Sequence, residues 1–300
     1  MSAQLIRNDW QVTRLAGALG AEVRNVRLAE LDQQDVVLIK QLLNEHLVLF
    51  FPEQHLTEME HVEFGRHFGV LEGHPNLDNP FTQTPELFEL AASRGGIADE
   101  WHSDLTFLPE PSILSILHMK KCPVAGGDTM WSSMYAAYEA LSPPIQEMCR
   151  GLTALHDAHP HDHAEQTAIH PVVRVHPDTG RQSLFVNEHF TRRIVELSAE
   201  ESRALLDLLT RWVQKPQFTV RYHWTQGAVG MWDNRCTQHY VLNDFDEERV
   251  IQRVTVVGDK PEGEPSRWPP RIKVGRGSAM ARHDRQLGRH LKLAKQSQFD

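Results

Sequence analysis

Hydrophobic residues in the first part of the chain follow three local patterns. Over residues 32–46 they recur at helical spacing, which predicts an amphipathic helix. The apolar run LVLFF at residues 47–51 ends at Pro52 and predicts a buried strand. Residues 10–28 mix short β-like runs with glycines, which is typical of a small strand pair.

Two further helices are indicated by capping boxes. The sequence TEME at residues 57–60 combines a capping Thr with a Glu three positions later, and predicts a helix that continues to about Phe68. The sequence SAEE at residues 198–201 repeats this pattern before a helix predicted over residues 202–213, which Pro216 closes.

Most of the remaining chain is β-like. Short strands with few intervening helices fit an antiparallel barrel or jelly roll better than a doubly wound parallel sheet. We therefore expect a mainly β fold with flanking helices (α+β). The predicted strands are Ser112–Met119, Val172–Val175, Leu184–Val186, Phe218–Trp224, Ala228–Trp232 and Val250–Val257.

Composition and charge exclude several classes of protein. The formal net charge is −9, which argues against a nucleic-acid binder. No apolar stretch approaches the roughly 18 residues of a membrane helix, and the start MSAQLIRNDW lacks the apolar core of a signal peptide. The three cysteines are widely spaced and do not form a disulfide framework. We expect a cytoplasmic protein without a membrane partner.

The C-terminal part of the chain differs in composition from the rest. The sequence turns proline-rich after about Lys260, and residues 271–300 contain eight Lys or Arg but two acidic residues. This shift predicts a domain over residues 1–262 and a basic extension over residues 263–300, more often a solvated tail than a partner-binding segment.

Eighteen histidines direct attention to metal or proton chemistry. In the sequence WHSD, His102 and Asp104 are two residues apart, and on a strand they would point to the same face. The sequence WDNRCTQH places His239 just past a predicted strand, on a turn-rich segment able to fold back. Two histidines and one carboxylate form the facial triad of non-haem Fe(II) oxygenases. The alternative is that His102 and Asp104 are only a hydrogen-bonded pair on an exposed strand, without a metal.

Two arginines follow in the strand-like run RVIQRVTVV. Arg249 and Arg253 are four residues apart, so on a strand they would share one face. A guanidinium binds a carboxylate through two parallel hydrogen bonds, and two arginines beside an iron site therefore suggest two anionic organic ligands. A surface charge pair with Glu247 or Glu248 is the alternative.

Together these motifs resemble the taurine dioxygenase (TauD/TfdA-like) family of Fe(II)/2-oxoglutarate-dependent dioxygenases. The resemblance extends from about Gly17 to Pro261, and is densest in WHSDLTF, GGDTMW, HPVVRVHPDTG, LFVNEHFTRRI, KPQFTVRYHW, WDNRCTQHY and RVTVVGDKP. It implies a double-stranded β-helix (jelly-roll, cupin-like) core, bound Fe(II), 2-oxoglutarate as cosubstrate, and O2. Some relatives are oligomeric, which makes a homo-oligomer an expectation.

The resemblance also implies roles for individual residues. His102, Asp104 and His239 match the iron ligands and so the catalytic centre. Thr129 and Arg249 match the pair that holds the distal carboxylate of 2-oxoglutarate. Trp232 is expected to line the cosubstrate pocket. The positions that match substrate contacts are His74, Phe190 and Arg253.

Some positions depart from the taurine enzyme. Leu77, Ala98 and Ala158 stand where that enzyme has Tyr, Asn and Phe, whereas the anion-binding groups are retained. We therefore expect a small organic anion other than taurine, such as a sulfonate or alkylsulfate, to be hydroxylated with release of succinate and CO2. A carboxylate such as an aryloxyalkanoate or an amino-acid derivative is the alternative substrate.

Other interpretations explain less of the sequence. A binding module without turnover has no need for the open coordination face of the triad, and a zinc hydrolase explains neither Arg249 nor the GGDT motif. The histidine-rich segment between His156 and His170 has no spacing typical of a closed metal site, so we expect a solvated lid loop there.

Overall fold

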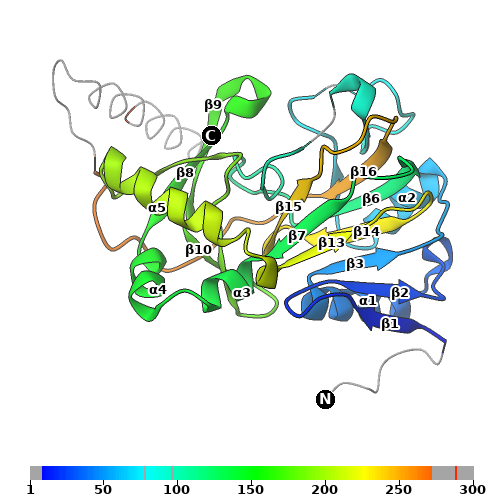
Figure 1. Ribbon diagram of the computed structural model, residues 1–300, viewed down its shortest axis with the longest axis horizontal. Helices are drawn as coiled ribbons and strands as arrows, with labels where there is room; N and C mark the ends of the chain where they lie inside the picture. Colours follow the sequence, from blue (N-terminus) through cyan, green and yellow to red (C-terminus); the bar gives the residue numbers. More distant parts are fainter. Residues whose placement is uncertain (1–8, 78, 96–97, 272–287, 289–300) are drawn as a thin grey trace.

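The computed structural model describes residues 9–77, 79–95, 98–271 and 288, and its largest element is a sheet of eight strands (Figure 1). Paired strands run antiparallel except β2 and β3. In spatial order the strands are β1 (Gln11–Arg14), β2 (Ala21–Arg24), β3 (Val48–Phe51), β14 (Val229–Asp233), β6 (Leu114–Lys121), β16 (Val250–Val256) and β4 (Leu71–Glu72), with β5 (Leu87–Ala91) also paired to β16.

A three-stranded sheet faces the large one. In it β7 (Thr129–Ser133) lies between β13 (Thr219–Tyr222) and β15 (Thr237–Val241). A second small sheet has β8 (Thr153–Ala158) between β9 (His163–Pro171) and β12 (Thr191–Ile194), and β10 (Val173–Val175) pairs with β11 (Gln182–Leu184). Antiparallel sheets packed face to face form the predicted jelly-roll type of core.

Strand β3 shows why its sequence is apolar throughout. Leu49 and Phe51 belong to the core beneath the helices, whereas Val48 and Phe50 belong to the core between the two facing sheets. The Phe50 ring stacks on Tyr222 of the small sheet with ring centroids 3.9 Å apart. Because both faces of the strand are buried, the hydrophobic run is continuous, and the predicted buried strand is confirmed.

Helices cover the outer surfaces of the sheets (Figure 1). The side chains of α1 (Gln33–His46) and α2 (Glu58–Arg66) pack on the large sheet, and those of α3 (Met134–Glu139), α4 (Pro143–Arg150) and α5 (Ala199–Trp212) pack near the smaller ones. Capping boxes at Thr57 and Ser198 are confirmed. The 3-10 helices are η1 (Leu28–Glu30), η2 (Ala92–Arg94), η3 (His159–His161) and η4 (Pro216–Phe218).

The prediction of a lid loop between His156 and His170 is wrong. This segment forms the antiparallel pair β8 and β9, joined by η3. Both histidines are buried, and His170 Nε2 donates hydrogen bonds to the carbonyls of Thr106 and Leu108 at 2.9 and 3.1 Å. The polar sequence did not indicate the strands, because His170 bonds to distant backbone carbonyls and His156 Nδ1 to the Thr106 hydroxyl rather than to water.

The predictions for α5 and for the C-terminal extension can also be compared with the structure. Helix α5 begins at Ala199, three residues before the prediction, because the box at Ser198 opens it directly. Within the extension, the backbone amides of Arg267 and Arg271 donate to Gly151 and Val195, and most of the later residues lie outside the described part of the chain.

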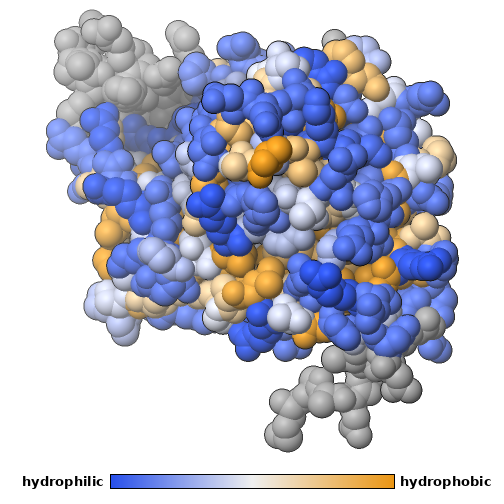
Figure 2. Space-filling view, turned by 45° about the vertical axis from the view of Figure 1, so that its right-hand side comes forward, coloured by the Kyte–Doolittle hydropathy of each residue, from blue (hydrophilic) through white to orange (hydrophobic). Residues whose placement is uncertain are grey.

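Polar residues dominate the surface in the view of Figure 2, where hydrophobic residues appear in small groups among them. Among the described residues, no helix combines the length and the apolar character that crossing a membrane requires.

Candidate functional site

The two segments predicted to carry metal ligands meet between the facing sheets. His102 forms an isolated antiparallel bridge with His239, and the amide of each residue donates to the carbonyl of the other at 3.1 and 2.8 Å. The backbone then turns at Asp104, and Leu105 takes a φ of 54°. The expectation that His102 and Asp104 lie on one strand is wrong, because a turn brings the carboxylate beside the imidazole.

His239 lies within β15, which corrects the expectation that it follows a strand on a turn. The turn itself occupies residues 234–236 and links β14 of the large sheet to β15 of the small one. The candidate ligand atoms of His102, Asp104 and His239 all lie within 4.8 Å of one another, and His102 Nε2 is 3.8 Å from Asp104 Oδ1. The structure thus brings these three residues together.

Protonation in this cluster suits a divalent metal. His102 Nδ1 lies 2.7 Å from the carbonyl of Glu100, which fixes the proton on Nδ1 and leaves a lone pair on Nε2. Burial lowers the pKa of His239 to about 4 and holds that of His102 well below its ordinary value. Burial alone would raise the pKa of Asp104, but Arg253 and the two histidines lower it. Two neutral imidazoles and a carboxylate are the donor set of Fe(II) in this geometry.

A hydrogen-bonded group orients the Asp104 carboxylate. Ser115 Oγ donates to Asp104 Oδ2 at 2.6 Å, and Asn234 Nδ2 donates to Ser115 Oγ at 2.9 Å. The amide of Asp104 donates to Asn234 Oδ1 at 3.2 Å. Oδ2 is therefore engaged by the protein, and Oδ1 faces His102. Sequence analysis missed Ser115, which carries no local signal, and Asn234, whose place in the WDNR motif could have drawn attention to it.

Thr129 and Arg249 lie together, as the resemblance implied. Arg249 Nη2 is 3.4 Å from Thr129 Oγ1, which also accepts a hydrogen bond from Trp224 Nε1 at 2.9 Å. Burial lowers the pKa of Arg249 to about 10, so the guanidinium is still charged at neutral pH. It forms no salt bridge within the described part of the chain. A buried cation without a carboxylate partner is a suitable site for an anionic ligand.

Trp232 lies against both His239 and Trp131. Its ring centroid lies 4.7 Å from that of His239, and its Nε1 donates to Asn234 Oδ1 at 2.9 Å. Trp232 is fully buried at the end of β14, where it packs against Trp131 of β7. The indole therefore fixes the position of His239 and forms a flat wall next to it.

The three predicted substrate contacts gather on another side of His102. Arg253 Nη1 donates to Asp104 Oδ1 at 3.0 Å, and the Phe190 ring lies 6.3 Å from that of His102. The His74 ring is 5.2 Å from Phe88, over which Arg253 also lies. A register shift after Val250 separates Arg253 from Arg249, so their even spacing does not place them on one face; each reaches a different side of the site.

Two further histidines near the site escaped sequence analysis. The His189 ring lies 5.3 Å from that of His102, and His189 Nδ1 is paired with Glu100 Oε2 at 2.5 Å. The His161 ring lies 5.0 Å from His74. His161 comes from η3 and His189 from the turn before β12, and the sequence does not reveal where either segment lies.

A second cluster of metal-binding residue types, His176, Asp233 and Cys236, serves a structural purpose. His176 Nδ1 accepts the amide hydrogen bonds of two following residues, so its Nε2 carries the proton that it donates to Asp233 Oδ2 at 3.0 Å. Arg235 forms a salt bridge with the same carboxylate at 2.6 Å. Burial raises the pKa of the Cys236 thiol. With its acceptors satisfied, the cluster holds the turn between β14 and β15 and leaves no ligand atom free for a cation.

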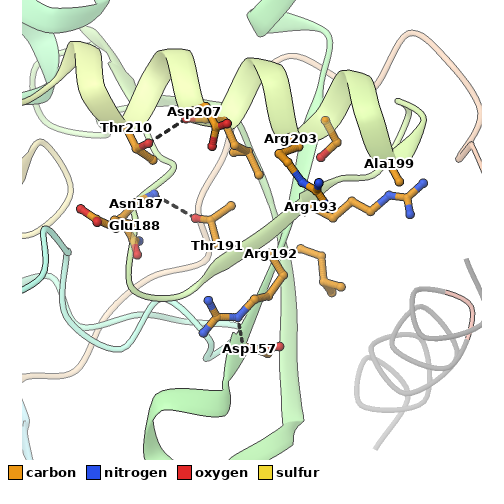
Figure 3. Close-up of a pocket in the computed structure, with 13 residues that line it drawn as sticks. Asp157, Asn187, Glu188, Thr191, Arg192, Arg193, Ala199, Arg203, Asp207 and Thr210 are labelled. Atoms are coloured by element: carbon orange, nitrogen blue, oxygen red, sulfur yellow. Dashed lines mark hydrogen bonds and ion pairs between the residues drawn. The ribbon is translucent and has the colours of Figure 1, made fainter. Parts of the chain in front are cut away.

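Neither of two pockets in the described part of the chain includes a candidate metal ligand. A pocket of about 510 Å³ lies beneath α5, where Arg192 points to Asp157 at 2.6 Å (Figure 3). A pocket of about 390 Å³ is lined by Glu100, His159 and His189 among others. Because His189 also contacts the His102 ring, the smaller pocket is the one that approaches the centre.

Comparison with known proteins agrees with this geometry. The profile described as "Taurine catabolism dioxygenase TauD, TfdA family" matches residues 11–255. The chain is 37% identical over 276 residues to the alkylsulfatase of Acinetobacter baylyi, covering 84% of this chain and 86% of the relative. It is 35% identical over 280 residues to the alpha-ketoglutarate-dependent sulfate ester dioxygenase of Pseudomonas putida (85% and 92%). The crystal structure of a taurine dioxygenase from Burkholderia xenovorans superposes with a TM-score of 0.79 at 35% identity, covering 95% of this chain and 99% of that one.

Proposed function

Because the chain belongs to the TauD/TfdA family of taurine catabolism dioxygenases, we propose that it hydroxylates a small organic anion that carries a sulfate ester or sulfonate group. The enzyme class is a 2-oxoglutarate-dependent non-haem iron dioxygenase. The observation that carries the substrate proposal is the Arg253 guanidinium, whose side chain is 11% exposed and whose Nε is buried without a hydrogen-bond partner in the described residues. A largely buried guanidinium whose Nε–H donor is unused favours an anionic substrate beside the candidate metal ligands.

We assign the metal to His102, Asp104 and His239. His102 Nε2 and Asp104 Oδ1 face each other, and His239 Nδ1 is buried without a hydrogen-bond partner among the described residues, which supports the assignment. Bound Fe(II), with 2-oxoglutarate and O2, supplies the oxidising power that hydroxylates a C–H bond while 2-oxoglutarate becomes succinate and CO2. The hydrogen bond from Ser115 keeps one carboxylate oxygen of Asp104 directed away from the ligand cluster.

We assign the distal carboxylate of 2-oxoglutarate to Arg249 and Thr129. The guanidinium supplies charge and the Thr129 hydroxyl supplies a further hydrogen bond, and Trp224 orients that hydroxyl by donating to it. Trp232 limits the space beside His239 and excludes water from this side.

We assign the substrate head group to His74 and Arg253, and apolar contacts to Phe190. In this arrangement the carbon that bears the sulfur group lies nearest the metal ligands, so hydroxylation occurs there. For a sulfate ester the hydroxyl proton and the C–O bond to sulfate are then lost together: the product collapses to an aldehyde and hydrogen sulfate. Positioning of the head group thus decides both the site of oxidation and the release of the anion.

We also propose that residues 1–262 form the catalytic domain and residues 263–300 a basic extension. The family profile ends at residue 255, which supports this division. A chain truncated after residue 262 is expected to retain turnover, and loss of turnover in a folded truncation would contradict it. The predicted homo-oligomer is tested by light scattering of the full chain.

The test of the function is a substrate screen with the full chain, Fe(II), ascorbate and 2-oxoglutarate. Alkyl sulfates, alkyl sulfonates and aryloxyalkanoates of matched length are compared by succinate, sulfate and sulfite release. We expect stoichiometric succinate and inorganic sulfur anion from one of the first two series, and neither from the His102→Ala variant. A stable hydroxylated carboxylate, without release from any sulfur compound, would replace the proposal with the carboxylate alternative.

A further inference from the structure

We propose that His161 is a specificity-determining residue that donates a hydrogen bond to the sulfate or sulfonate group of the substrate, alongside His74. This inference rests on the proposed function and deepens it. His161 is the last residue of η3, the short helix between β8 and β9.

The His161 ring faces the candidate site rather than solvent. Its centroid lies 5.0 Å from that of His74, 5.4 Å from that of Phe190 and 5.5 Å from that of Phe107. The two preceding residues, His159 and Pro160, are exposed and line the pocket of about 390 Å³. The η3 turn therefore presents His161 inward and its other two residues outward.

The hydrogen-bonding state of both imidazoles suits an anion. His74 Nδ1 accepts the amide hydrogen of Asn76 at 3.2 Å, so the proton of the neutral ring is on Nε2, which serves as a donor. His161 Nδ1 is buried and has no hydrogen-bond partner in the described part of the chain. Burial, aided by His189 and Arg253, lowers the pKa of His161 to about 4, so near pH 7 it is a neutral donor and not a second charge.

A pair of amides fixes the distance between the two histidines. Asn76 Nδ2 donates to Gln166 Oε1 at 2.8 Å, and Gln166 Nε2 donates to Asn76 Oδ1 at 2.9 Å. Asn76 is two residues after His74, and Gln166 lies on β9, the strand that follows η3. The segment that carries His74 and the hairpin that carries His161 are therefore held together next to these two histidines.

The surroundings of His161 indicate what the rest of the substrate must be. Phe107, Phe190, Leu105 and Ala158 form one buried hydrophobic cluster beside it. A sulfate or sulfonate has three terminal oxygens, enough to accept hydrogen bonds from His74, His161 and Arg253 together. The combination of three donors with an apolar wall fits an alkyl chain that ends in a tetrahedral sulfur anion better than a planar carboxylate.

The experiment compares His161→Phe, which keeps the ring but removes the nitrogen, with His161→Asn, which places an amide nitrogen near the position of Nδ1. His163→Phe, two residues along on β9, is the matched control. Steady-state rates at pH 7.5 are measured for an alkyl sulfate and for the alkyl carboxylate of equal length. For His161→Phe we expect KM for the sulfate to rise by roughly 10- to 100-fold with a smaller change in kcat, as for loss of a hydrogen bond to a charged group.

Further outcomes separate this inference from the function on which it rests. The anaerobic visible absorption that appears with Fe(II) and 2-oxoglutarate is expected to be unchanged in all three variants, and His161→Asn is expected to recover most of the affinity. An unchanged KM in His161→Phe, an equal loss for sulfate and carboxylate, or loss of the absorption band would overturn the role of His161. A wild-type enzyme that releases no sulfur anion from any compound would instead overturn the proposed function.

Discussion

Arg253 Nη1 lies 3.0 Å from Asp104 Oδ1, so the guanidinium on the substrate side is hydrogen-bonded to a candidate metal ligand. The same carboxylate is held through its other oxygen by Ser115. Because one arginine contacts both the ligand cluster and the place assigned to the substrate, an anion that engages Arg253 also changes the surroundings of Asp104. In the function proposed above, the Arg253 side chain therefore couples substrate binding to the candidate metal centre.

The first prediction concerns Arg253→Gln. Removal of the buried cation is expected to lower kcat/KM for the organic anion by roughly 100-fold, because a charge-assisted hydrogen bond is lost. Because Arg253 also bonds to Asp104, rates are measured at saturating Fe(II), which separates weaker metal binding from weaker substrate binding. Arg66→Gln is the control, since Arg66 on α2 pairs with Glu63 and Glu86 on the surface. Equal effects of the two substitutions would contradict a substrate contact by Arg253.

The second prediction concerns the support of Asp104. Ser115→Ala removes the hydrogen bond to Oδ2 and frees the carboxylate to rotate, so affinity for Fe(II) is expected to fall by roughly 10- to 100-fold. Competition with a chromophoric chelator measures this. Ser112→Ala removes a buried hydroxyl that bonds Glu72 instead, and should leave metal affinity unaltered. If both variants bind iron like the wild type, Ser115 does not position the ligand.

Local signals account for what could be predicted of the fold. The side chains of Thr57 and Ser198 bond to amides three residues away, so sequence alone is enough to place the helix starts. The run at β3 is apolar because both its faces are buried. Recognition of His102 and His239 depended on motifs, and these named the residues without giving the turn that brings Asp104 to them.

What could not be predicted depends on contacts between distant segments. His170 bonds to the carbonyls of Thr106 and Leu108 more than sixty positions away, and without those partners its sequence is typical of a solvated loop. Ser115 looks like any serine in a strand until Asp104 is placed beside it. His161 reaches the site through a hairpin that the polar sequence concealed.

The third prediction concerns the cosubstrate. Arg249→Lys keeps the charge but loses the planar fork, so KM for 2-oxoglutarate is expected to rise by roughly 10- to 100-fold. The rate at saturating 2-oxoglutarate should stay within a few fold of the wild type. Arg221→Lys, at a half-exposed arginine paired with Asp128, is the control and should change neither constant. An unchanged KM in Arg249→Lys would place 2-oxoglutarate elsewhere.

The fourth prediction tests the structural cluster at the β14–β15 turn. Asp233→Asn leaves the buried Arg235 without its main partner and is expected to lower the free energy of unfolding by about 3 kcal/mol. Asp178→Asn removes a half-exposed partner of the same arginine, and a loss below about 1 kcal/mol is expected. Urea denaturation in the presence of a chelator measures both. Stabilisation of the apo protein by zinc through His176 and Cys236 would show that the cluster binds metal after all.

The last prediction concerns pH and the buried histidines. Burial lowers the pKa of His61 and of His170 to about 4, from an ordinary value of 6.5 that the unfolded chain retains. Above pH 6.5 neither state is protonated at these positions, so their contribution to stability is complete. Between pH 6.5 and about 4 these histidines are protonated in the unfolded chain but not in the folded one. The free energy of unfolding therefore decreases as the pH falls, by about 1.4 kcal/mol per pH unit for each histidine.

Urea denaturation of the chelated protein at pH 7.5 and at pH 5.5 measures this loss. In His61→Phe the difference between the two pH values is expected to be about 1.4 kcal/mol smaller than in the wild type, because one of the groups responsible is gone. Whatever the new ring does to packing affects both measurements equally and cancels in the difference. His67→Gln, at an exposed histidine on the next turn, should leave the difference unaltered. An unchanged difference in His61→Phe would mean that His61 takes up its proton equally in the folded and unfolded chain, and that its burial has no part in the acid sensitivity of the fold.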